Sequence, residues 1–89
     1  MRDPHNVNVY AESISLSKDI YSLTISKEEE YGLKRQIRRA AISIALNIAE
    51  GCARETNREY AQFLVQARGS NTEVQCALEL GKELGLIDF

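Results

Sequence analysis

The 89-residue sequence has no tryptophan, one proline, one histidine and two cysteines, and these low counts exclude several classes of protein. Cys52 and Cys76 form no Cys-x-x-Cys pair and only His5 could join them as a ligand, so no metal site is expected. Isolated cysteines within apolar runs are typical of core residues in a reducing compartment. No apolar run approaches the ~20 residues of a membrane span, and the N-terminus lacks a hydrophobic signal region. We therefore expect a soluble cytoplasmic protein with no cofactor and no membrane partner.

Aromatic residues are also few, with four tyrosines and two phenylalanines, which is too few for the core of a β-sandwich. The sequence is rich instead in leucine, isoleucine, alanine, glutamate, lysine and arginine, which favour helix. Apolar residues recur at spacings of three and four in three segments, about 7–24, 31–50 and 58–84. Short connections between them predict antiparallel neighbours. The fold expected for residues 1–89 is one all-α domain, an antiparallel up-and-down helical bundle.

The middle segment is the most apolar and is therefore expected at the centre of the bundle. Two apolar stripes run along it, and between residues 40 and 49 only Ser43 and Asn47 are polar. A helix that is apolar on most sides is expected to be buried on most sides. Gly51 is expected to end this helix, Ser26 and Glu29 to form a capping box before it, and Thr56 or Asn57 to cap the third helix.

Charge is unevenly distributed along the chain, although the net charge is only −2. Residues 34–58 carry six basic and two acidic side chains, whereas the segments before and after them are each acidic by −3. A basic segment of this kind is typical of a surface that binds phosphate. The candidate nucleic-acid-binding residues are Lys34, Arg35, Arg38, Arg39, Arg54 and Arg58.

A polar row follows the middle helix at steps of three or four residues, and it allows two interpretations. Its members are Gln36, Arg39, Ser43, Asn47, Glu50 and Arg54, and a matching row on the third helix holds Gln62, Gln66, Ser70 and Glu73. One interpretation is a hydrogen-bonded network that fixes helix packing, because unpaired buried polar groups cost ~1–3 kcal/mol each. The structural network would comprise Gln36, Ser43, Asn47, Glu50, Ser70 and Glu73. The other interpretation is that the basic end of the row binds phosphate.

Enzymatic motifs are missing, so no catalytic residue and no small-molecule substrate are expected. The sequence has no phosphate-cradling glycine loop, and a Ser/His/Asp arrangement would have to use His5 near the N-terminus. The Glu-x-x-His pairs of bundle metal enzymes are also missing. The four tyrosines are expected at the edge of the core rather than as platforms for bases.

Three motifs of the sequence carry a resemblance to a known family. Gln-Ile-Arg-Arg-Ala occupies residues 36–40, and Asn-Ile-Ala-Glu-Gly occupies residues 47–51. An aromatic residue, a Gly-Ser pair and a following glutamate lie at Phe63, Gly69, Ser70 and Glu73. In these motifs the sequence resembles the 23S rRNA intervening sequence proteins, whose pattern for the first motif is Gln-Ile-x-Arg-Ala. This four-helix-bundle family is itself similar to the accessory variability protein of diversity-generating retroelements. The resemblance covers nearly the whole chain. It implies a homo-oligomer, a pentamer in the family, and RNA or DNA as partner.

The sequence departs from the family pattern at its C-terminal end, because the family continues into a fourth helix after Gly-Leu-Ile. Here the chain has three expected helices, so we expect the fourth to be absent or truncated and the neighbouring apolar stripes to favour association. Two functional hypotheses follow. The first is a bundle that binds nucleic-acid backbone, and the second is a structural or protein-interaction module whose arginines and glutamates are buried as ion pairs.

Overall fold

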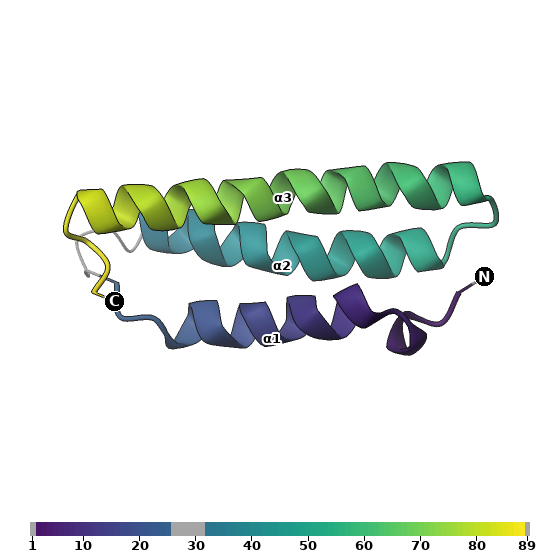
Figure 1. Ribbon diagram of the computed structural model, residues 1–89, viewed down its shortest axis with the longest axis horizontal. Helices are drawn as coiled ribbons and strands as arrows, with labels where there is room; N and C mark the ends of the chain where they lie inside the picture. Colours follow the sequence, from purple (N-terminus) through teal and green to yellow (C-terminus); the bar gives the residue numbers. More distant parts are fainter. Residues whose placement is uncertain (1, 26–31, 89) are drawn as a thin grey trace.

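The computed structural model describes residues 2–25 and 32–88, which form three long helices and one short 3₁₀ turn (Figure 1). The turn η1 spans Pro4–Asn6, and the helices are α1 (Asn8–Ser22), α2 (Leu33–Cys52) and α3 (Asn57–Glu83). The described residues contain no strand, only an isolated antiparallel bridge between Ile25 and Ile87. The prediction of an all-α bundle is confirmed. The expected capping box at Ser26 and the expected helix start near residue 31 lie outside the described residues.

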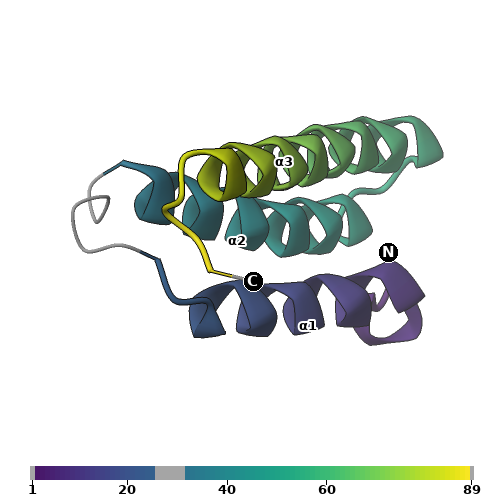
Figure 2. The ribbon, with the colours of Figure 1, turned by 60° about the vertical axis from the view of Figure 1, so that its left-hand side comes forward.

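Helix α2 lies between α1 and α3 and packs against both of them (Figures 1 and 2). The flanking helices stay apart, because no Cα atom of α1 lies within 8 Å of a Cα atom of α3. The described part of the chain is elongated, with extents of 44 × 19 × 18 Å. The middle helix therefore lies at the centre of the bundle, as predicted.

The ends of the helices follow from local chemistry. The Thr56 hydroxyl accepts a hydrogen bond from the Glu59 backbone N–H at 3.1 Å and caps the start of α3, as predicted. Asp3 caps η1 through the His5 backbone N–H, and this hydrogen bond lowers the pKa of the Asp3 carboxyl. After α3, Gly85 adopts a φ of 70°, a left-handed conformation that glycine takes without strain.

The expected helix end at Gly51 was wrong, because α2 continues through Gly51 to Cys52. Gly51 is buried against the start of α3, where an added Cβ would lie only 2.9 Å from the Cβ of Phe63. The glycine therefore serves a close approach between helices rather than a turn.

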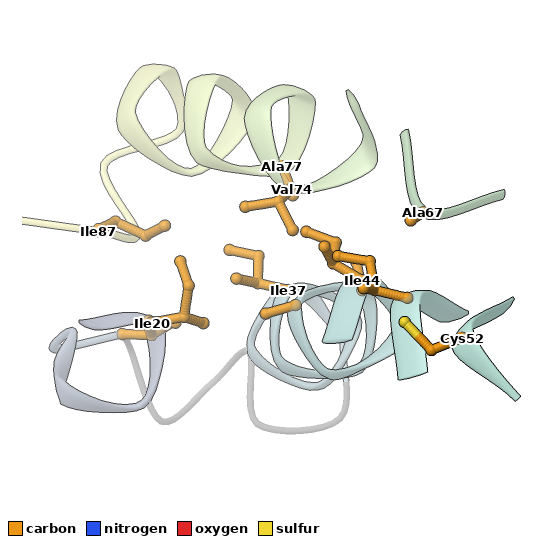
Figure 3. Close-up of a cluster of buried hydrophobic side chains, with 12 residues drawn as sticks. Ile20, Ile37, Ile44, Cys52, Ala67, Val74, Ala77 and Ile87 are labelled. Atoms are coloured by element: carbon orange, nitrogen blue, oxygen red, sulfur yellow. The ribbon is translucent and has the colours of Figure 1, made fainter. Parts of the chain in front are cut away.

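The core is an apolar cluster along the inner faces of all three helices (Figure 3). Ile37, Val74 and Cys52 are its largest fully buried side chains. The segment after α3 adds Ile87, whose backbone N–H bonds to the Gly81 carbonyl at 3.2 Å and whose side chain points toward Ile20. Because Gly81 has no side chain, Ile87 packs directly over the α3 backbone.

The prediction that both apolar stripes of the middle helix are buried was wrong for one of them. Ile37, Ala41, Ile44 and Ile48 are buried, whereas Ile42 and Leu46 are exposed. Two flanking helices cover only part of the circumference of α2, and the rest of its surface is left open. This open face of α2 is where the candidate site lies.

Candidate functional site

A groove of about 880 Å³ runs along the open face of α2, with one wall provided by Tyr21 in the last turn of α1. We call it the α2 groove. Its α2 residues succeed one another at helical spacing, so they share one side of the helix. Among the described residues, none of the side chains that line it is acidic. The lining residues are Tyr21, Lys34, Arg35, Arg38, Arg39, Ile42, Ser43, Leu46 and Asn47.

Four of the six predicted nucleic-acid-binding cations line this groove, within the first two turns of α2. Arg35 and Arg39 are exposed and Lys34 is half-buried. The side chains of these three residues make no ion pair, hydrogen bond or ring contact in the described part of the chain. Like charges this close repel one another, so the cluster gains from any anion that lies between them. The groove is therefore a positively charged surface without an internal counter-charge among the described residues.

Arg38 differs from its neighbours because it contacts Tyr21. Its guanidinium carbon lies 4.5 Å from the centre of the Tyr21 ring, and its Nη2 donates to the Tyr21 carbonyl at 3.3 Å. A cation over an aromatic face is attracted by the ring quadrupole, by about 0.5–1 kcal/mol at an exposed site. Arg38 and Tyr21 thus hold each other in place at the junction of α1 and α2.

The other two predicted cations, Arg54 and Arg58, lie at the opposite end of α2. The helical steps from Arg35 to Cys52, the last residue of α2, span about 26 Å along the axis, and Arg54 follows just after the helix ends. The Arg54 Nη2 atom is 2.6 Å from Glu50 Oε1, and its guanidinium carbon lies 4.7 Å from the centre of the Phe63 ring. Arg58 is exposed at the start of α3. The basic segment of the sequence is therefore divided in space into a cluster of four and a separate pair.

Three of the six predicted network residues meet between α2 and α3. The Ser43 and Ser70 hydroxyl oxygens are 2.8 Å apart, and Asn47 Nδ2 donates to the Ser43 hydroxyl at 3.0 Å and to its carbonyl at 2.9 Å. Ser43 and Asn47 also form part of the groove lining, so this network joins the lining to α3 through Ser70. The other three do not join it: Glu50 pairs with Arg54, while Gln36 and Glu73 are exposed without a partner among the described residues.

Sequence reasoning missed Tyr21, Ile42 and Leu46 as site residues. Tyr21 was expected at the edge of the core, but 47% of its surface is exposed, and 38% of Ile42 and 64% of Leu46 are exposed as well. The available signal was position: Val9, Leu16 and Ile20 recur at helical spacing on one face of the first helix, and Tyr21 lies beside that face. The sequence of one helix does not show which of its apolar faces lacks a neighbouring helix.

A second, smaller groove of about 390 Å³ lies between α1 and α3. Its floor holds Ile44 and Ile48, and Glu12 and Arg68 lie on opposite walls. Neither groove brings metal ligands together, since the described residues contain no cluster of three His, Cys, Asp or Glu side chains suited to a metal ion. Among the helices of the described chain, none is both long and apolar enough to span a membrane.

The family model described as 23S rRNA-intervening sequence protein matches residues 5–89. No curated protein matches the chain.

Proposed function

The chain belongs to the 23S rRNA-intervening sequence protein family, and we propose that it is a non-catalytic bundle protein that binds RNA or DNA backbone through the basic α2 groove. The observation that supports this most is the set of cations Lys34, Arg35 and Arg39, which line one groove and have no counter-charge in the described chain. Phosphates are the anions that such a surface fits, because each arginine offers two parallel N–H donors.

The proposed contacts are electrostatic, so binding depends on salt and only weakly on sequence. A site that neutralises four phosphates releases the counterions held by them, and its affinity for a B-DNA duplex falls with a log–log salt slope of roughly −3.6. A net charge of −2 on the whole chain repels a polyanion at long range, which makes the local cluster more important at short range.

We further propose that the protein acts as a homo-oligomer, with a pentamer as the number that the family resemblance implies. Several grooves on one assembly raise the effective concentration of cations along a bound strand and offset the acidic remainder of each chain. A cytoplasmic location fits the proposal, because Cys52 and Cys76 are both free thiols and the cytoplasm keeps thiols reduced.

The test compares two double variants with the same net charge. Binding of a fluorescein-labelled 16-nucleotide RNA of mixed sequence is followed by fluorescence anisotropy at ~50 mM salt. Arg35→Gln with Arg39→Gln removes two groove cations and is expected to weaken binding by at least about 10-fold. Arg58→Gln with Arg68→Gln changes charge away from the groove and is expected to retain affinity within about 2-fold. Equal losses in the two variants, or no binding by the unaltered protein, would contradict the proposal.

The alternative is a structural or protein-interaction module whose arginines act as packing ion pairs. One observation favours it, the Arg54–Glu50 pair, in which the arginine also lies over Phe63. The two proposals differ at Arg39. In the alternative, Arg39→Glu unfolds the bundle or separates its subunits, whereas in phosphate binding it leaves the helical circular dichroism unchanged and abolishes RNA binding.

A further inference from the structure

We propose that the α2 groove takes single-stranded nucleic acid in preference to a duplex, with unpaired bases against Tyr21, Ile42 and Leu46 and phosphates on Arg35 and Arg39. We call the first three residues the apolar wall. This inference rests on the proposed function and names the class of ligand that the same groove selects.

The apolar wall is the feature that phosphate binding leaves unexplained. Its side chains are among the exposed large apolar residues of the described chain, and they gather beside arginines rather than being scattered. Apolar side chains held in water cost free energy in proportion to their area, and phosphate oxygens do not relieve that cost. The faces of nucleic-acid bases do, because they are flat and apolar and stack on aromatic and aliphatic side chains.

The spacing of cations and wall suits one strand. Arg35, Arg39, Ile42 and Leu46 follow one another on α2 at steps of four, three and four residues. Arg39 and Ile42 are therefore separated by about 4.5 Å along the helix axis, on the same face. In a nucleotide the phosphate and the base are joined through a single sugar, so a strand in the groove reaches the cation and the wall together.

Tyr21 is the side chain best prepared to receive a base. Arg38 fixes it from one side through the ring contact at 4.5 Å and from the backbone through the 3.3 Å hydrogen bond. A ring already held in position loses little conformational entropy when a base stacks on it. Arg38 adds a planar cation at the same place, and guanidinium planes also stack with bases.

A duplex does not use this arrangement. Its bases are stacked on one another and paired in its interior, and its outer surface presents phosphates and sugars. The apolar wall would then lie against a charged backbone, while a flexible single strand turns its bases toward the wall. The geometry therefore favours unpaired nucleotides, with little dependence on base identity because every base has a flat face.

The test compares the affinity of the protein for a labelled 16-nucleotide strand without internal pairing with its affinity for the duplex of that strand and its complement, under identical salt. The single strand is expected to bind about 10-fold more tightly. Tyr21→Ala is expected to weaken binding of the single strand by roughly 5- to 150-fold, the range for the loss of one stacked base. Binding of the duplex is expected to stay within about 2-fold, and Tyr21→Phe, which keeps the ring, is expected to keep the preference.

A second pair of variants guards against misfolding. Leu46→Ser changes a wall residue that is mostly exposed, and Leu80→Ser makes the same change at a 56% exposed leucine on α3 outside the groove. Only Leu46→Ser is expected to lower single-strand affinity, with the helical circular dichroism unchanged in both. The same affinity in the two variants would overturn the inference.

The outcomes separate this inference from the proposed function. Equal binding of strand and duplex, with loss of both in the Arg35→Gln and Arg39→Gln double variant, overturns the strand preference and leaves phosphate binding standing. No binding of either overturns both. A fall in the oligomeric mass of Leu46→Ser, measured by light scattering, would show that a second copy of the chain covers the wall and would also overturn the inference.

Discussion

The two faces of α2 belong to one helix but differ in what covers them. On the inner face, Ile37 and Ile44 pack among side chains from α1, α3 and the segment after α3 (Figure 3). On the groove face, Arg39 and Leu46 have no helix opposite them in the described chain. The inner face thus determines stability, whereas changes on the groove face should alter binding and leave the fold intact. Apolar residues on one helix can therefore have different roles: those on the inner face of α2 form the core, whereas Ile42 and Leu46 on the groove face are exposed.

The largest difference in stability is expected between alanine variants of two isoleucines, one on each face of α2. Ile37→Ala removes a fully buried side chain and is expected to lower the free energy of unfolding by about 2–5 kcal/mol, because it loses burial and leaves a cavity. Ile42→Ala makes the same chemical change on the groove face and is expected to cost less than about 1 kcal/mol. Urea denaturation followed by circular dichroism measures both.

If Ile37→Ala is too unstable to fold, Ile37→Val provides the smaller step, at about 0.5–1.5 kcal/mol. If the alanine variants at positions 37 and 42 lost similar free energies of unfolding, the groove face would also be packed, and the distinction between the two faces would be contradicted.

Two glycines on α3 provide the next contrast. An added Cβ at Gly81 would lie 2.7 Å from Ile87 Cγ1 and 2.8 Å from Leu33 Cδ2, whereas a Cβ at Gly69 would meet nothing within 4 Å. Both alanine variants gain the same helix propensity, about 1 kcal/mol. Overpacking is therefore expected to make Gly81→Ala less stable than Gly69→Ala by about 1–3 kcal/mol.

Thermal or urea unfolding of the two glycine variants measures that difference directly. Gly69→Ala is expected to be more stable than the unaltered protein, because nothing opposes the gain in propensity. Equal stabilisation by both variants would mean that Ile87 does not pack on α3, and the segment after α3 would then contribute little to the core.

The fold could be predicted from the sequence because its determinants are local or periodic. The spacing of apolar residues indicates three helices, and the Thr56 cap marks the start of α3. Gly51 shows where this reasoning fails. A glycine near a helix end usually stops the helix, but here it admits Phe63, and a contact between distant residues leaves no mark in local sequence.

The candidate site was predicted only in part for the same reason. The sequence identified the groove cations only as part of a basic segment that also included Arg54 and Arg58. It placed Ser43 and Ser70 in one polar network, but their direct contact is known from the structure alone. The exposure of Tyr21 and Leu46 could not be predicted, because it depends on which side of α2 the flanking helices occupy. Periodicity gives the direction of a side chain around its helix, but it does not say whether a neighbour lies in that direction.

The smallest expected effect is at the hydrogen bond where the two faces meet. Ser43→Ala leaves the Ser70 hydroxyl without its partner, and Ser70→Ala leaves the Ser43 hydroxyl with Asn47 alone, so each is expected to cost about 1 kcal/mol. The double variant removes both hydroxyls, so it is expected to cost less than the sum of the single variants by about 0.5–1 kcal/mol. Gains in helix propensity from serine to alanine cancel in this cycle, since each appears once alone and once in the double variant. Strictly additive costs, measured by urea unfolding of all four proteins, would mean that the 2.8 Å contact does not couple α2 to α3.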